Sequence, residues 1–136
     1  MVLHISPDRT ISELQNDFSE AFPGLKLVFF TKPHHAHKGS AAKFLVQDRE
    51  ATLGSLSSHL KTGYLLIEHD MVVWQLERLF ETEYALHVQV FRKSGRTWLE
   101  TSRTDDLTIE QQQAKAKISE QIHQEFVDPM DYRDQD

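Results

Sequence analysis

The stretch YLLIEHDMVVWQLERLFETEYALHVQVFR, residues 64–92, decides the fold, because it nearly repeats VLHISPDRTISELQNDFSEAFPGLKLVFF, residues 2–30. The two copies match without a gap until one extra residue near Pro23. Apolar positions coincide along both copies, and Phe18 in the first falls on Phe80 in the second. Apolar residues alternate at the ends of each copy and have helical spacing in the middle, so each copy predicts strand, helix, strand.

We therefore expect two internally duplicated β-α-β units, at about residues 2–31 and 64–93. In the first unit, Thr10 and Glu13 have the spacing of a helix capping box, which marks where the helix begins. Two strands joined by one helix of this length are normally parallel, with a right-handed crossover. The repeat therefore predicts parallel strand pairing within each unit.

Beyond the second helix, residues 86–93 and 96–102 predict a β-hairpin that is closed by a turn at Ser94-Gly95. A turn at these two residues places Phe91 opposite Trp98. Together with the two units, the hairpin predicts an α+β fold with one mixed sheet and with helices mainly on one face.

Residues 107–126 are rich in strong helix formers and predict a C-terminal helix, with the acids of Thr104-Asp105-Asp106 at its N-terminal end. We expect a single domain over residues 1–127. Within it, residues 32–51 lack periodicity and carry Pro, Gly and small residues, which predicts a mobile surface loop. Residues 128–136 form an acidic C-terminal tail.

The composition argues against several classes of protein. The 136 residues include no Cys, so we expect neither a disulfide framework nor a thiolate metal site. No stretch approaches the roughly 18 apolar residues of a membrane span, and we expect a cytoplasmic protein. The net charge of −6 comes from residues 105–136, which hold 9 acidic and 3 basic side chains. The near-neutral remainder lacks the many Lys and Arg that phosphate binding needs, so nucleic acid is not an expected partner.

The loop PHHAHKG contains a local cluster of metal-ligand residue types, His34, His35 and His37. Imidazoles this close together can hold a transition metal ion, which would make the protein a small metal-dependent enzyme or ligand binder. The competing interpretation is a solvated loop, because no carboxylate lies nearby in sequence to orient the rings. The sequence has no Gly-rich phosphate loop, serine elbow or HExxH motif, so an enzyme is disfavoured and no cofactor is expected.

A second candidate site is an open sheet face. Strand alternation sends Phe91 and Trp98 to the side opposite the helices, and Phe30, which aligns with Phe91, points the same way. Three aromatic side chains on a polar surface are typical of a docking face. The hairpin adds three cations to this partner-binding set: Arg92, Lys93 and Arg96. In the competing interpretation, the loop at residues 32–51 covers the aromatics and the cations only protect a strand edge.

The segment YALHVQVFRKSGRTWLETSRTDDLT, residues 84–108, resembles a family of small bacterial proteins of unknown function. In that family a similar run, VQVFRKSG-x-x-W-x-x-T-x-x-TDD-x-T, recurs after helix patterns of the T-x-x-E-L and L-E-x-x-F type. The resemblance covers most of the chain and is most specific over residues 88–106. It implies a shared fold and no particular activity, so it transfers no catalytic residue.

From these features we expect a non-enzymatic cytoplasmic interaction domain that binds another protein or itself, as a homodimer, through the open sheet face. The alternative is a small metal-dependent enzyme or ligand binder that uses the histidine loop.

Overall fold

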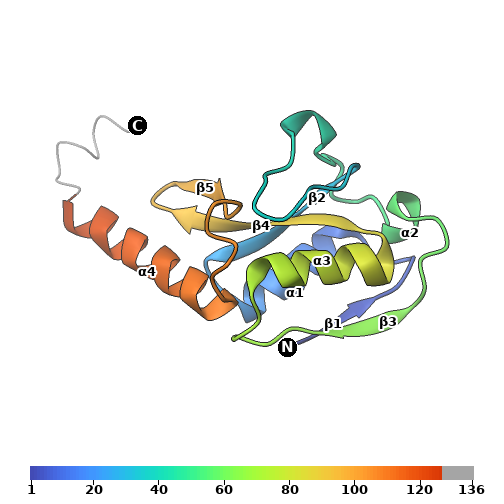
Figure 1. Cartoon of the computed structure of the whole chain (residues 1–136), viewed down its shortest axis with the longest axis horizontal. Helices are drawn as coiled ribbons and strands as arrows, with labels where there is room; N and C mark the ends of the chain where they lie inside the picture. The colour runs from blue at the N-terminus through green and yellow to red at the C-terminus, as the bar shows by residue number, and fades with distance from the viewer. Residues whose placement is uncertain (127–136) are drawn as a thin grey trace.

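The computed structural model describes residues 1–126, and the predicted acidic tail lies outside them. The elements are β1 (Val2–Ile5), α1 (Ile11–Ala21), β2 (Leu25–Phe30), η1 (Ala42–Phe44), α2 (Leu53–Leu56), β3 (Gly63–Leu66), α3 (Val73–Tyr84), β4 (His87–Ser94), β5 (Thr97–Glu100) and α4 (Ile109–Phe126). Strands and helices are mixed along the chain, which confirms the predicted α+β class (Figure 1).

The strands form two antiparallel sheets, β1-β3 and β2-β4-β5, so the predicted mixed sheet and the parallel pairing within each unit are wrong. The physical reason is that each strand pairs with its counterpart in the other unit. Leu3 lies opposite Leu65, and Val28 lies opposite Gln89, which are pairs of aligned positions in the repeat. Antiparallel pairing of aligned residues is what a two-fold axis between the paired strands would produce. The duplication itself stays a prediction.

The core forms where the apolar stripes of α1 and α3 meet the sheets. Figure 1 shows these helices with β1 and β3 along one side and β2 and β4 along the other. Phe18 and Phe80 are both fully buried, as the repeat predicts. Thr10 caps α1 and exchanges hydrogen bonds with Glu13, which confirms the capping box. The first turns of α4 pack on the body, and its C-terminal half extends away from it (Figure 1).

The hairpin register differs from the prediction by two residues. Ser94 pairs with Thr97, so the turn is Gly95-Arg96, and Lys93 rather than Phe91 lies opposite Trp98. Gly95 has a φ of 59° and takes the first turn position, where hairpin turns of this length require a positive φ. A shift of two residues keeps the faces, so Phe91 and Trp98 still share one side of the sheet.

The segment after β2 folds back along this strand instead of standing free. The Thr31 N–H donates to the Phe44 carbonyl at 2.8 Å, and the Val46 N–H donates to the Phe29 carbonyl at 2.9 Å. Phe30 forms an isolated bridge with Leu45 and is 3% exposed. The competing interpretation, a loop that covers the aromatics, therefore holds for Phe30.

Two further local features complete the frame. The N-terminus of α4 is capped by Thr108 and Gln111, which bond reciprocally, and not by the predicted acids at residues 105 and 106. Those acids lie in the connection between β5 and α4, where they are free to contact the loop after β2. In the described part of the chain, no helix combines the length and the apolar character needed to cross a membrane.

Candidate functional site

The candidate site begins at a free edge of β4. β5 pairs only with residues 91–94, so the first half of β4 has no strand on that side. Side chains take the place of the strand: His34 Nε2 donates to the Val88 carbonyl at 2.9 Å, and the Val90 N–H donates to Glu77 Oε2 at 2.7 Å. The Thr101 hydroxyl donates to the Val90 carbonyl at 2.9 Å. This edge therefore brings the histidine loop and α3 together.

Glu77 is a charged-type residue in the buried stripe of α3, and only 4% of it is exposed. Its Oε2 accepts a second hydrogen bond, from Gln89 Nε2 at 3.1 Å. Its Oε1 is buried and has no hydrogen-bond partner among the residues that the structure describes. A buried oxygen without a partner costs about 1–3 kcal/mol, so its presence in a folded core needs an explanation.

His34 lies beside Glu77, with 3.7 Å between His34 Nε2 and Glu77 Oε1. His34 Nδ1 lies 3.0 Å from the His35 carbonyl, and Nε2 lies 2.9 Å from the Val88 carbonyl. A carbonyl can only accept, so both bonds form when both ring nitrogens carry a proton. Burial of the ring opposes this charge, but the bond to the His35 carbonyl and the charge of Glu77 outweigh it, and the pKa of His34 is raised.

Burial raises the pKa of Glu77 from 4.5 to about 8. The hydrogen bond from Val90 and the charge of His34 act in the opposite direction, whereas the negative charges of Asp105 and Glu100 add to the increase. At neutral pH the carboxyl group is therefore mostly protonated. Its proton belongs on Oε1, because Oε2 already accepts two N–H bonds. A neutral carboxylic acid held this way can donate a hydrogen bond or act as a general acid.

A pocket of about 380 Å³ opens between α3 and the histidine loop, with Glu77 among the residues that line it. Its walls combine apolar, aromatic and charged side chains: Pro33, His34, His35, Ala36, Trp74, Arg78, Glu81, Thr82, His87 and Val88. Near its rim, His87 Nδ1 contacts a carboxylate oxygen of Glu81. This volume suits a small organic molecule, and a mostly apolar cavity with few polar groups is typical of ligand sites.

The remaining end of the loop is fixed by Asp105. The carboxylate of Asp105 is fully buried and accepts from the His37 N–H at 2.8 Å, and its other oxygen lies 2.6 Å from His37 Nδ1. Asp106 Oδ1 lies 3.7 Å from His37 Nε2. Within residues 1–126, these three form the one group whose ligand atoms are close enough for a shared metal ion. Both Asp105 oxygens are already used by His37, so the group acts first as a clamp on the loop.

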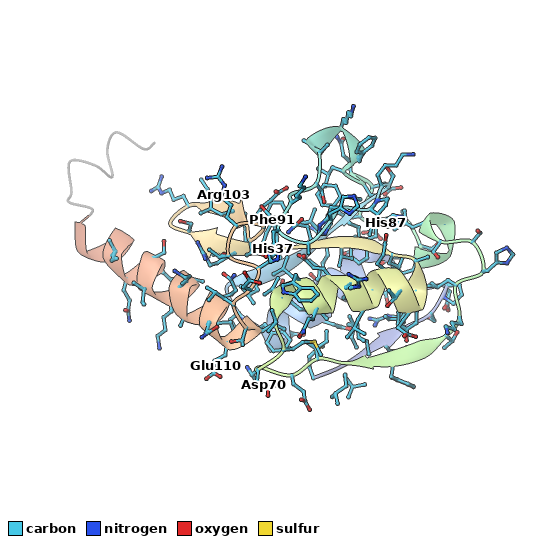
Figure 2. All side chains as sticks on the ribbon, in the orientation of Figure 1. His37, Asp70, His87, Phe91, Arg103 and Glu110 are labelled. Carbon is cyan, nitrogen blue, oxygen red and sulfur yellow. The ribbon has the colours of Figure 1, made fainter. Side chains whose placement is uncertain are left out.

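The three histidines predicted as metal ligands are therefore not brought together as one ligand set. His34 enters the pocket beside Glu77, His35 lies at the pocket wall, and His37 is held by Asp105. Figure 2 shows His37 and His87 at separate points above α3. A metal site made of His34, His35 and His37 does not agree with this geometry, because an ordered loop directs the three side chains to different places.

The predicted sheet-face site is only partly assembled. Phe91 and Trp98 are half-buried on one side of the sheet, with Lys93 Nζ 5.2 Å from the centre of the Trp98 ring. Lys26, which the sequence did not suggest, places its Nζ 4.6 Å from the same ring. Three predicted residues lie apart from this cluster: Phe30 is covered, Arg92 donates to Gln112 on α4, and Arg96 is at the turn.

Glu77 is the residue that the sequence reasoning missed. A signal was present, because Glu77 lies one turn after Val73 and just before Phe80 in the apolar spacing of α3. An acid at the margin of a stripe usually reaches solvent, so spacing alone does not identify it. What decides its burial is the fold of residues 33–38 over the helix, and that contact is distant in sequence.

Comparison with protein-family models, with curated proteins and with solved structures found no match to this chain. The resemblance to a bacterial family therefore stays a prediction.

Proposed function

We propose that the protein binds a small organic ligand in the pocket between α3 and residues 33–36. The observation that carries the proposal is the buried, unpartnered Oε1 of Glu77 in a concave pocket of about 380 Å³. A ligand that bonds to this oxygen explains why the fold tolerates it. Perturbed titration in a pocket is also a general mark of functional sites.

The proposal keeps one part of the sequence-based alternative and drops another. It keeps a ligand site that involves the histidine loop, since His34 and His35 line the pocket. It drops the shared metal ion, since the three predicted histidines point to different contacts. The acid–base chemistry of Glu77 is available to a bound molecule, so binding and catalysis would use the same carboxyl group.

A protein-observed NMR screen of a chemically diverse fragment collection tests the proposal. We expect hits whose binding shifts the amide signals of Glu77 and Val88 and the indole signal of Trp74. Trp98→Phe is the matched control, because it leaves the pocket untouched and removes the other indole. Trp74→Ala removes one wall and should abolish the same hits. A screen whose hits leave the pocket signals unchanged, or which gives no hit, contradicts the proposal.

A second candidate function is self-association through the face that carries Phe91 and Trp98. The observation that favours it is the pair of ammonium groups stacked on the half-buried indole, since Lys26 and Lys93 offer positive charge around an apolar centre. Residues 105–136, which carry the excess of acidic side chains, supply the complementary charge on a second copy. Trp98→Lys tests this face, because it places a third cation at the apolar centre and should lower the mass measured by light scattering.

A further inference from the structure

The two oxygens of Glu77 have different roles, and this difference fixes what the pocket offers. Oε2 accepts from the Val90 N–H at 2.7 Å and from Gln89 Nε2 at 3.1 Å, so it cannot carry the acid proton without losing a bond. The proton of a neutral Glu77 therefore sits on Oε1, which has no hydrogen-bond partner within the described chain. A neutral Glu77 therefore places an O–H donor, itself covered from solvent, at the lining of the pocket.

The charged groups around Glu77 come from several parts of the fold. From α3 come Arg78 and Glu81, and Glu81 contacts His87 of β4. Asp105, from the segment before α4, is engaged by His37, and Glu100 belongs to β5. From the histidine loop comes His34, whose two ring nitrogens both face carbonyls. Around Glu77, His34 adds positive charge and Asp105 and Glu100 add negative charge, while Arg78 brings a second cation to the pocket lining.

We infer that the ligand is a small organic anion of the carboxylate class, whose oxygen accepts the Glu77 Oε1–H bond beside the positive charges of His34 and Arg78. This inference rests on the proposed function. An acid–carboxylate hydrogen bond is a strong, charge-assisted contact, and it is strongest where water is excluded. The pKa of about 8 for Glu77 keeps the donor proton in place at neutral pH.

A cationic ligand fits the same groups less well. An amine would need the ionised carboxylate, which burial disfavours, and it would lie near His34 and Arg78. The two ligand classes therefore make opposite demands on Glu77. The anion needs a donor at the position of Oε1, and the amine needs an acceptor there.

Glu77→Gln separates these demands. The Gln carbonyl oxygen takes the position of Oε2, because the Val90 and Gln89 N–H groups need an acceptor, and this leaves the amide NH₂ facing the pocket. The variant therefore imitates the neutral acid and cannot lose its donor as the pH rises. An anion should still bind to it, whereas an amine should not.

The experiment titrates benzoate and benzylamine, which differ mainly in the charge next to the ring, into the wild type and Glu77→Gln by NMR in the millimolar range expected for fragments. We expect benzoate to shift the Glu77 and Val88 signals in both proteins, with affinities within about threefold. From pH 7 to pH 9 the wild-type affinity should fall about tenfold, because the donor is lost with a pKa of about 8. The fall in Glu77→Gln, which reports His34 alone, should be smaller.

Three outcomes overturn the carboxylate class: benzoate leaves the pocket signals unchanged, Glu77→Gln abolishes benzoate binding, or benzylamine binds the wild type more tightly than benzoate. None of these removes the proposed function if the fragment screen gives other hits in the pocket. A screen without pocket hits removes both proposals, so the two failures are distinguishable.

Discussion

Gln15 in α1 and Glu77 in α3 occupy aligned positions of the repeat. Both bond to a neighbouring strand, but they differ in whether all their polar atoms have hydrogen-bond partners. Gln15 Nε2 donates to the Leu27 carbonyl of β2 at 2.8 Å, and its Oε1 accepts from Arg49 Nε at 2.8 Å. Both of its polar ends are satisfied. Glu77 also bonds to the neighbouring strand, but one of its oxygens is left without a hydrogen-bond partner in the described chain.

The difference shows where a site can arise when two helices carry polar residues at aligned positions of the sequence. Each helix uses one polar residue to tie its buried face to a strand edge, which is a structural task. In the first unit that residue is neutral and saturated. In the second unit this residue is an acid, and residues 33–36 lie over it. The same position therefore bonds to the neighbouring strand and also holds a buried oxygen without a hydrogen-bond partner. The candidate function lies in what the two units do not share.

The largest expected effect tests whether the units share equivalent cores. Phe18→Ala and Phe80→Ala should each reduce the free energy of unfolding by about 3–5 kcal/mol, because both side chains are fully buried and the cavity left behind is large. Urea denaturation measures it, with Phe91→Ala on the half-buried outer face as the control. A loss below about 1 kcal/mol for either core variant would break the equivalence.

Exchanging the residue types at the aligned positions sharpens the contrast between them. Gln15→Glu removes the donor to the Leu27 carbonyl and should cost about 1–3 kcal/mol at neutral pH. The cost should be smaller in acid, where the introduced carboxyl group is protonated and can donate again. Glu77→Gln keeps an acceptor for Val90 and should be tolerated. An equal loss in the free energy of unfolding for Gln15→Glu and Glu77→Gln at neutral pH would show that the two positions have the same structural role.

The pH dependence of Glu77→Gln follows from the raised pKa of Glu77. The folded protein keeps this proton up to about pH 8, whereas the unfolded chain loses it near its ordinary value of 4.5. The associated stability is therefore fully present below pH 4.5 and is lost as pH rises to about 8, by at most about 1.4 kcal/mol per pH unit. His34, whose pKa is also raised, acts in the same direction in the wild type, and part of this increase comes from the charge of Glu77, which Glu77→Gln removes.

The stability of Glu77→Gln relative to the wild type should accordingly increase between about pH 5 and pH 8 and then stay level. Urea denaturation of both proteins at several pH values measures the difference, which reports Glu77 together with the part of the His34 shift that Glu77 causes. A difference that stays constant over the range would mean that the carboxyl group titrates normally.

A smaller effect concerns the contact between Asp105 and His37, which anchors the histidine loop over α3. Asp105→Asn keeps one acceptor oxygen but turns the other toward a donor, so anchoring of the loop at His37 should weaken by about 1–2 kcal/mol. Hydrogen exchange of the amides of residues 34–38 should speed up while that of β1 does not. Asp106→Asn, at a side chain that is 75% exposed, is the matched control. Unchanged hydrogen exchange in Asp105→Asn would show that residues 34–38 are held in place by other contacts.

The smallest effect on stability is expected at the outer sheet face. Trp98→Lys should change the free energy of unfolding by only about 0.5 kcal/mol, since the side chain lies outside the core, while it weakens self-association. Circular dichroism follows the fold and light scattering follows the mass. An unfolded variant would place Trp98 in the core, and an unchanged mass would remove self-association through this face.

The sequence predicted the parts of this structure that depend on local spacing. The stripes of α1 and α3, the Thr10–Glu13 capping box and the burial of Phe18 and Phe80 follow from periodicity and from short-range hydrogen bonds. The sheet arrangement did not follow. Alternation along a strand says which face is buried, but it does not say which strand is the neighbour, and here each strand pairs with its counterpart.

The site was predictable only in part, for the same reason. His34 was suggested by a cluster that could hold a metal, yet it lies beside Glu77, a residue 43 positions away. The hairpin turn moved by one residue because Gly95 rather than Ser94 adopts the positive φ, and this moved Trp98 from Phe91 to Lys93. A contact distant in sequence decided the first case, and the backbone freedom of Gly95 decided the second.

The pairing of strands between units also sets the order in which the chain can become stable during synthesis. Every β1-β3 and β2-β4 pair joins residues 57 to 67 positions apart. At a typical 5–20 residues per second, the ribosome needs about 3–12 s to make the roughly 60 residues that separate a strand from its partner. For that interval the first unit has no sheet partner, and its apolar strands are open to other chains. The nascent first half therefore depends on shielding, and no cut between the units leaves a self-sufficient half.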